Sequence, residues 1–470
     1  MKVFSGSSFG VILAAVALYI PGLKRYTSTV PEGDKNQQKG GLRSRLRNRP
    51  RIRPTVYGYL TEEKESLRQG FAALFISSVG ELIAGLALAS ITGTLEELVG
   101  LAVLIPAAIG MRGAIFGAMG SRLSTAIQTG LFRVNLRRGV LAENVQAAAI
   151  LSLISGVFLA FLARYLSDLL GIRSELSVLD YAVISTVGGI LAGILLIGIT
   201  ILVARLSVSR GWDMDNIAAP MLTAAGDILT LPALVLATTL IGIPVFSNVF
   251  AAVLILAAIA AVGFGFRLGA RDLRRILAES LPILALSGVA MTLVGLALED
   301  RREVFFTFPA LLILLPAFLQ EGGALGGILS SRLSSKVHLG LLEPRSLPQL
   351  RAFRDFTLTY IFAIGVYLFI GGAAHWLAVG LGQLGPGVLD TLGLEPGSLS
   401  PGFFAMVGIS AVAGLIATTA SVFAAYYGST VSYRLGLDPD TYGIPIITAS
   451  VDLFGFMSLI IAMIFFGIAG

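Results

Sequence analysis

The sequence predicts an all-α polytopic membrane protein built from two tandem copies of one five-helix unit. Of the 470 residues, 55% are hydrophobic and only 13% are charged, whereas a soluble domain carries about 25% charged residues. Apolar runs of about 20 residues, each long enough to cross the hydrocarbon core of a bilayer, recur from residue 71 to the C-terminus. Two polar motifs also recur, in the same order, in the two halves of the chain.

The apolar runs predict eleven transmembrane helices. They lack the alternation of an outer-membrane barrel, and a helix satisfies its own backbone hydrogen bonds in lipid. We expect spans at residues 71–90, 96–120, 145–167, 181–204, 215–242, 245–266, 280–298, 305–331, 355–381, 402–431 and 441–468. With the N-terminal side inside, 16 basic residues fall at the inner ends of these spans and four at the outer ends. This asymmetry follows the positive-inside rule.

The segment ahead of the first span is strongly basic. Twelve of the 34 Lys and Arg residues lie between Lys24 and Arg68, in a polar stretch typical of a disordered cytoplasmic arm. Attraction to anionic headgroups explains this charge, so we expect the lipid bilayer as a partner and no nucleic acid. The apolar run Phe9–Leu23 lacks a clear cleavage site, which favours an extra anchor or an interfacial helix. The cell (plasma) membrane is the expected location.

The two halves of the chain repeat each other. Residues 106–130, PAAIGMRGAIFGAMGSRLSTAIQTG, match residues 316–340, PAFLQEGGALGGILSSRLSSKVHLG, at ten of 25 positions with a shift of 210. Residues 213–227, DMDNIAAPMLTAAGD, match residues 438–452, DPDTYGIPIITASVD, with a shift of 225. Chance similarity between apolar helices would not place Pro, Gly and Ser-Arg-Leu-Ser in register, so duplication is the better explanation.

Five spans in each copy, with one span between the copies, predict a parallel arrangement. We expect a basic arm at residues 1–70, a first repeat at 71–244, a connecting helix at 245–270 and a second repeat at 271–470. Two five-span units joined directly would face opposite ways, but the connecting helix returns the chain to the inner side. Parallel copies are related by a pseudo-twofold axis along the membrane normal, and such an axis can enclose a central pore.

The fifth span of each repeat carries the candidate ion-binding residues. Asp227 lies 12 residues after Asp215, about 18 Å further along a helix, and an acid at that depth costs about 3 kcal/mol unless it is compensated. The axis would bring Asp227 and its copy Asp452 together, where they repel each other unless a cation or a proton lies between them. The candidate metal ligands are Asp227, Asp452, Thr223, Thr448, Asn216, Asp213, Asp215, Asp438 and Asp440.

Other roles for these residues stay open. Asp227 can pair with Arg112 or hold a proton bonded to a carbonyl, and the two threonines can bond the carbonyl one turn back. The four acids at the inner mouth can cap their helices. Two further acids in the spans, Glu81 and Glu321, have no acidic copy in the other half and are candidates for a pore wall or a proton relay.

The composition limits the chemistry of any site. The chain has no cysteine and only two histidines, His338 and His375, which excludes disulfides, Cys-containing zinc sites and iron–sulfur clusters. A site among the spans must therefore be built from carboxylates, hydroxyls, amides and carbonyls, which suit hard cations. We find no paired nucleophile and base and no His-rich metal site, so we expect neither an enzyme nor an organic cofactor.

The repeated motifs resemble those of the MgtE-type magnesium transporters, in the duplicated form of eukaryotic solute carrier family 41 and its archaeal relatives. The segments GMRGAIFGAMGSRLSTA and DMDNIAAPMLTAAGDILTLP, each with its copy, carry the resemblance, which covers residues 71–468. The resemblance implies that Mg²⁺ is the transported ion and that Asp227 and Asp452 face a central pore. It places Asp213 and Asp438 at the inner mouth.

We therefore expect a divalent cation, Mg²⁺ before others, to cross the membrane through a central pore lined by the fifth helix of each repeat. One chain contains both copies, so the pore should form without a second chain. The alternative is a proton- or sodium-coupled cation exchanger, in which Asp227, Asp452, Glu81 and Glu321 act as a relay.

Overall fold

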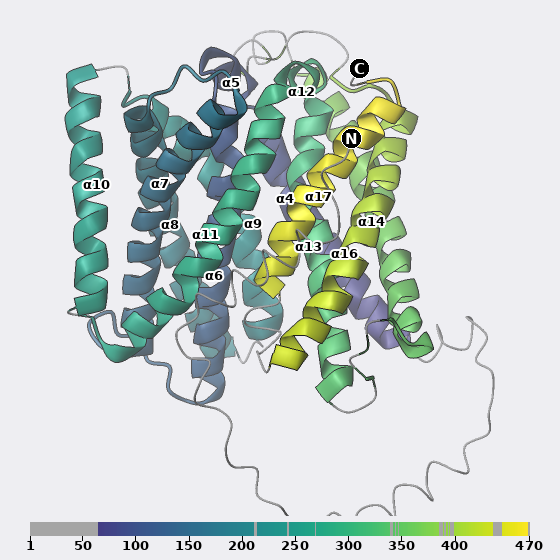
Figure 1. Ribbon diagram of the computed structural model, residues 1–470, viewed down its shortest axis with the longest axis horizontal. Coiled ribbons are helices and arrows are strands. Elements are labelled where there is room, and N and C mark those ends of the chain that lie inside the picture. Colours follow the sequence, from purple (N-terminus) through teal and green to yellow (C-terminus); the bar gives the residue numbers. More distant parts are fainter. Residues whose placement is uncertain are drawn as a thin grey trace, which may run out of the picture. The chain divides into compact units, whose positions relative to one another are not determined.

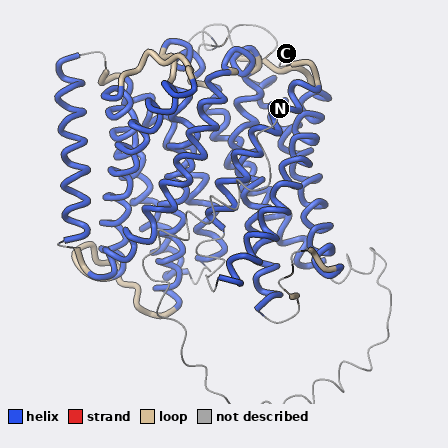
Figure 2. The backbone as a smooth tube through the Cα atoms, in the orientation of Figure 1, coloured by secondary structure: helices blue, strands red, loops and turns tan. Residues whose placement is uncertain are grey.

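The computed structural model describes residues 64–468 except 211–213, 242–243, 268, 339–341, 344, 346, 385–388, 390–391, 393, 395–398 and 436–443. The basic arm at residues 1–63 and the apolar run Phe9–Leu23 therefore lie outside the described residues. All regular structure within the described residues is helical (Figure 2).

Thirteen described helices belong to one compact unit, Glu65–Gly470. They are α4 (Lys64–Ala89), α5 (Thr92–Glu97), α6 (Leu101–Gln128), α7 (Val140–Leu170), α8 (Val178–Arg210), α9 (Met214–Thr238), α10 (Pro244–Arg267), α11 (Arg271–Asp300), α12 (Arg302–Thr307), α13 (Pro309–His338), α14 (Leu350–Gly382), α16 (Phe403–Leu435) and α17 (Ile444–Phe465). The first of these helices, α4, begins at Lys64, one residue ahead of the unit.

The chain is a multi-pass integral membrane protein. Among the described residues, nine helices are long and apolar enough to cross a bilayer, and α4 and α9 contribute the shorter apolar stretches Leu74–Ala89 and Leu222–Thr238. These eleven helices correspond to the eleven predicted spans.

Two predicted span boundaries are wrong. The spans expected to begin at residues 96 and 305 begin inside the short helices α5 and α12, which are separate from α6 and α13. The backbone leaves helical geometry at Leu98 and Phe308, with ψ of 80° and 81°. Both residues are apolar, so hydrophobicity alone did not reveal these breaks.

Helix bounds recur along the chain at the offsets found in the sequence. Helices α5 and α12 are offset by 210 residues at both ends, and α8 and α16 by 225. The packing has one feature that the sequence pattern did not indicate: the first long helix of each half contacts the other half. We call this arrangement the exchange of first helices. Helix α11 packs on α6 and α7, while Phe71 and Phe75 of α4 make edge contacts with Phe362 and Phe369 of α14.

Glycines allow this exchange of first helices. A Cβ added at Gly85 of α4 would lie 2.7 Å from the carbonyl carbon of Ile313 in α13. A Cβ added at Gly295 of α11 would lie 2.8 Å from the carbonyl carbon of Val103 in α6. Gly85 and Gly295 are 210 positions apart, and so are Val103 and Ile313, so the two close approaches are equivalent. Backbones meet directly at both places, as small residues permit in membrane bundles.

Replacing Gly295 with Ala is expected to destabilise the protein by about 1–3 kcal/mol, because the new methyl group meets backbone that cannot rotate away. The matched control is Gly198→Ala in α8, where no atom lies within 4 Å of an added Cβ. Thermal unfolding in detergent should show a lower midpoint for the first variant only. Equal midpoints for both variants would contradict the close contact between α11 and α6.

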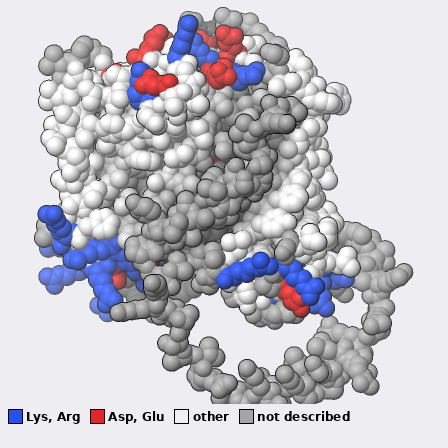
Figure 3. Space-filling view, in the orientation of Figure 1, with Lys and Arg blue, Asp and Glu red and all other residues white. Residues whose placement is uncertain are grey.

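Charge divides the two ends of the bundle. Helix α10 lies at the left edge in Figure 1 and packs on α7 and α8. Lys and Arg side chains gather along the lower side of the face in Figure 3, while acidic and basic side chains mix at the upper side. The lower side is where α10 ends and α11 begins, and Arg267, Arg271 and Arg274 belong to these two helix ends.

Candidate functional site

A cavity of about 690 Å³ lies between the helices of the two halves. Its walls come from α6, α9, α11, α13 and α17, with Leu88 of α4 at the edge. Pro106 and Pro316, the equivalent prolines inside α6 and α13, both line it. Most of the wall is apolar, and the polar side chains on it are few. Their positions therefore decide what the cavity can hold.

Four of the predicted ligands line this cavity. They are Thr223 and Asp227 from α9 and Thr448 and Asp452 from α17. Each aspartate is only 4% exposed, and the two carboxyl groups interact electrostatically. The structure thus brings the acids of the two fifth helices to one cavity, as the sequence predicted. The side chains of Asp213, Asp215, Asn216, Asp438 and Asp440 lie outside the described residues.

Small residues on α6 and α13 bring the threonines close to the neighbouring helix. A Cβ added at Gly113 would lie 3.6 Å from Cγ2 of Thr223, and one added at Gly323 would lie 2.9 Å from Cγ2 of Thr448. The second position also approaches Oδ1 of Asp452 at 3.8 Å. These glycines act as packing positions and leave room beside the acids.

The cavity has a wall that the sequence did not identify. Glu279, Ser280, Ser287 and Met291 of α11 line it. Ser280 and Ser287 are seven residues apart, which puts them on one face of a helix. This pair of hydroxyls in an otherwise apolar span was the sequence signal that could have identified α11 as a wall of the cavity.

Two more acids lie behind the cavity wall. Glu81 of α4 and Glu321 of α13 are fully buried and do not line the cavity. The Glu81 carboxyl group lies within electrostatic range of Asp227 and Glu321, but neither of its oxygens has a hydrogen-bond partner among the described residues. Of the four buried carboxyl groups, only those of Asp227 and Asp452 line the cavity.

The carboxyl group of Glu321 contacts the hydroxyl group of Ser78 in α4. Oγ of Ser78 lies 2.8 Å from Oε1 of Glu321 and 2.9 Å from the carbonyl oxygen of Leu74. A serine has one hydroxyl proton and can donate only one of these bonds. The hydroxyl proton of Ser78 is therefore shared between Oε1 of Glu321 and the carbonyl oxygen of Leu74, unless Glu321 carries a proton of its own and donates to Ser78. A neutral Glu321 also avoids the cost of a buried charge.

Arg112 does not compensate Asp227, so the alternative of a buried Arg112–Asp227 pair is wrong. Its Nη1 donates to the carbonyl oxygen of Gly189 in α8 at 2.8 Å. No ion pair of Arg112 occurs among the described residues. The arginine projects toward α8, because Gly189 has no side chain and leaves space for the guanidinium group.

The cavity suits an ion that keeps its water. No group of three or more acidic or histidine side chains among the described residues lies close enough to hold a bare metal ion. One water takes about 30 Å³ of liquid volume, so an ion with six waters needs roughly 200 Å³. The cavity is larger than this. Mg²⁺ usually keeps several of its waters while it touches one or two carboxylates.

A polytopic helical membrane protein with buried acids on a cavity large enough for a hydrated ion has the features of an ion-transport protein. The model of the MgtE family, described as divalent cation transporter, matches residues 105–237 and 315–462. The chain belongs to this family, whose members are transporters and not enzymes. The resemblance seen in the sequence is thereby confirmed.

Curated relatives agree with this assignment. Solute carrier family 41 member 2 of Mus musculus is 24% identical over 396 residues, which cover 78% of this chain and 64% of that protein. Solute carrier family 41 member 2 of Xenopus laevis is 30% identical over 144 residues, 27% of this chain and 23% of that protein. The chain thus spans less than two thirds of the length of these relatives.

Among solved structures, the eukaryotic MATE transporter AtDTX14 aligns with 86% of this chain and 96% of its own, at 12% identity and a TM-score of 0.32. The Vibrio cholerae MATE transporter VcmN in the bent form gives 14% identity and the same TM-score. At these TM-scores the similarity carries no argument about the arrangement of helices or the function.

Proposed function

We propose that this chain carries divalent cations, Mg²⁺ before others, across the membrane through the cavity. Asp227 and Asp452 are its ion-binding carboxylates, with Thr223 and Thr448 beside them. One observation carries the proposal: these four residues, predicted from two copies of one motif, line a single cavity. Asn216, on the helical face of Thr223 and Asp227, and the acids Asp213, Asp215, Asp438 and Asp440 complete the proposed ligand set. The four acids lie at the inner mouth, where acids raise the local cation concentration.

The ion passes with most of its water in place. Two carboxylates on one apolar cavity attract a divalent ion at low dielectric, and few protein ligands compete with its hydration shell. The ion in turn relieves the repulsion between Asp227 and Asp452. One chain supplies both carboxylates, so we propose that the pore forms within a monomer, in the cell (plasma) membrane, with no organic cofactor.

The proposal is tested by reconstituting the purified chain into liposomes that contain a Mg²⁺-sensitive dye. An inward Mg²⁺ gradient should increase the dye signal well above that of empty liposomes. A rate equal to that of empty liposomes, with the protein folded and inserted, would end the proposal.

We propose that the helices form two parallel five-helix repeats, at residues 71–244 and 271–470, joined by the connecting helix at 245–270 and related by a pseudo-twofold axis along the membrane normal. The equal helix offsets support this arrangement, as do the equivalent contacts of Gly85 and Gly295. The arginine-rich ends of the helices then face the cytoplasm.

Cysteines introduced at equivalent positions should label from one side of the membrane. Ser209 and Arg434 are offset by 225 residues, at the inner ends of α8 and α16. In this chain, which has no cysteine, Ser209→Cys and Arg434→Cys should both react with a membrane-impermeant maleimide from the cytoplasmic side. Glu175→Cys, in the loop before α8, should react from the outside. Labelling of the first two from opposite sides would mean inverted repeats.

Proton coupling through the buried acids is the second candidate function, and the full burial of Glu81 and Glu321 within electrostatic range of Asp227 is the observation that favours it. Glu321→Gln separates the two candidates, because a glutamine amide still donates to Ser78. If the Glu321 proton is fixed, this variant should keep wild-type stability and uptake, whereas Glu321→Ala should unfold at lower temperature. If Glu321 is a relay, Glu321→Gln should abolish the response of Mg²⁺ uptake to an imposed proton gradient.

A further inference from the structure

An arginine lines the path from the acids to the arginine-rich end of the bundle. The cavity follows α6 from Ile105 to Arg122, which corresponds to about 25 Å of helix. Near Arg122 the wall also includes Ser121, Glu279 and Ser280. A cation that travels between Asp227 and this end of the cavity therefore passes a guanidinium group.

The charge of Arg122 has no carboxylate partner in contact. Its Nε donates to Oδ1 of Asn144 in α7 at 2.7 Å, and the amide nitrogen of Asn144 donates to the carbonyl oxygen of Val140 at 2.9 Å. The asparagine is thus oriented with its oxygen toward the arginine, but it is neutral.

The carboxylate nearest to this arginine is already engaged elsewhere. Among the described residues, no ion pair within 4.0 Å involves Arg122. Glu279 of α11 interacts with Arg122 only at longer range, and it is ion-paired with Arg275 at 2.8 Å. Within the described part of the chain, Arg122 therefore has only a neutral amide in contact, and it shares the Glu279 carboxylate at longer range with Arg275, which leaves this end of the cavity wall with more positive than negative charge.

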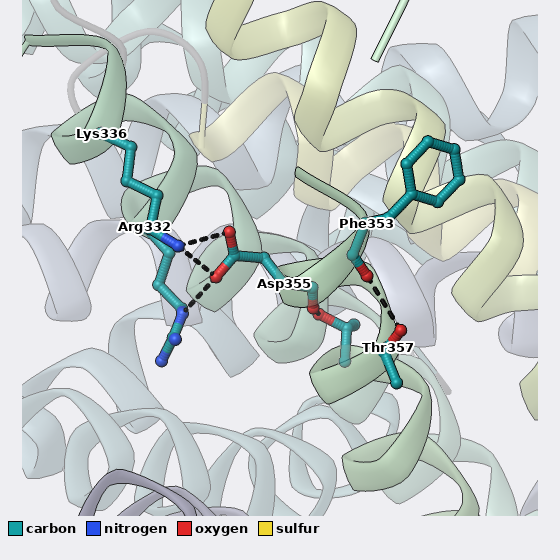
Figure 4. Close-up of polar contacts among 6 residues, drawn as sticks. Arg332, Lys336, Phe353, Asp355 and Thr357 are labelled. Atoms are coloured by element: carbon teal, nitrogen blue, oxygen red, sulfur yellow. Dashed lines mark hydrogen bonds and ion pairs between the residues drawn. The ribbon is translucent and has the colours of Figure 1, made fainter. Parts of the chain in front are cut away.

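The equivalent arginine of the second half is held differently. Nε of Arg332 donates to Oδ1 of Asp355 in α14 at 3.1 Å, and Nζ of Lys336 lies 2.6 Å from Oδ2 of the same carboxylate (Figure 4). The Asp355 side chain is fully buried. Arg332 does not line the cavity.

The two halves thus use one repeated Ser-Arg pair in two ways. The second half provides its arginine with a buried carboxylate, and the first half provides a neutral amide and directs the arginine to the cavity. Packing alone does not require this difference, because Asn144 and Asp355 have side chains of nearly equal size and each accepts a hydrogen bond from Nε of its arginine.

We propose that Arg122 is an electrostatic barrier at the inner end of the cavity that limits the rate at which divalent cations pass. The inference rests on the proposed function. A fixed positive charge repels a divalent ion twice as strongly as a monovalent one, and at about 8 Å in water the repulsion slows a divalent ion roughly fivefold. Asn144 sustains the barrier, because it positions the guanidinium group without neutralising it.

Two substitutions remove the barrier by different means. Arg122→Gln removes the charge, and Asn144→Asp keeps the arginine but gives it the carboxylate that Arg332 has in the second half. Both should raise the initial rate of Mg²⁺ uptake into proteoliposomes about three- to tenfold, measured per folded protein after size-exclusion chromatography. Asn144→Asp keeps the test valid if Arg122→Gln does not fold.

Two control variants separate charge from structure. Arg122→Lys keeps a positive charge at the cavity and should keep a rate close to that of the wild type. Arg332→Gln removes the charge of the equivalent arginine, which does not line the cavity. It should therefore lower stability without raising the rate of Mg²⁺ uptake.

The outcomes separate this inference from the proposed function. Faster uptake with Arg122→Gln and Asn144→Asp, but not with the two controls, supports the barrier. If the wild type transports Mg²⁺ but folded Arg122→Gln and Asn144→Asp take it up at the same rate or more slowly, the barrier is overturned and the proposed function stays intact. A wild-type protein without any Mg²⁺ uptake overturns both.

Discussion

Replacement of Asp227 with Asn is expected to reduce Mg²⁺ uptake to nearly the level of empty liposomes while the protein stays folded. Asparagine has almost the same size and shape as aspartate, so the packing of α9 against α6 should survive. The charge does not survive. A carboxylate and a divalent ion about 4 Å apart attract each other by about 2 kcal/mol even at the dielectric constant of water, which corresponds to roughly thirtyfold in occupancy. The dielectric constant in the mostly apolar cavity is lower than that of water, so the loss of ion occupancy should be at least this large.

The matched control is another aspartate-to-asparagine change outside the cavity. Asp300 ends α11, its side chain is 64% exposed, and it faces Arg301 at 3.7 Å. Asp300→Asn should keep the wild-type rate, because exposed ion pairs contribute little. Uptake rates of the two variants are compared in the same liposomes at equal amounts of folded protein. A folded Asp227→Asn protein with wild-type uptake would remove Asp227 from the ion path.

The sequence predicted the number of long helices and the shared helical face of their periodic polar residues because both depend on local pattern. A run of apolar residues indicates a span wherever its helix packs. The positions of Thr223 and Asp227, four residues apart, indicate a shared helical face without any knowledge of neighbours. The duplication then placed Thr448 and Asp452 in the same relation, so the structure confirmed that these four residues lie together.

The exchange of first helices could not be predicted in this way. It depends on contacts between residues far apart in the sequence, such as Gly85 with Ile313 and Gly295 with Val103. A glycine in an apolar run indicates close packing, but it does not say which helix it contacts. For the same reason, the sequence could not show that α11 supplies a wall of the cavity.

Arg122 and Arg112 show a second limit of sequence reasoning. Both arginines lie on α6, ten residues apart, and the sequence left Arg112 open as a partner of Asp227. The side chain of Arg112 instead turns to the backbone of Gly189, while Arg122 lies on the cavity wall. The direction of a long side chain depends on where neighbouring helices leave space, and that space becomes visible only when the bundle is assembled.

The two fifth-helix acids should act as one site, so their substitutions should not add. Asp227 and Asp452 line the same cavity and interact electrostatically, and both belong to one chain. A monomer, identified by light scattering in detergent, should therefore bind one Mg²⁺ with both carboxylates in titration calorimetry. Each single change to Asn should weaken binding strongly, and the double variant should be only slightly worse than either, because the first change already breaks the shared site. The pair Asp227→Asn and Asp300→Asn serves as the additive reference. If each single variant instead kept the wild-type affinity and lost half of the bound Mg²⁺, the chain would contain two independent sites, and each carboxylate would hold its own hydrated ion.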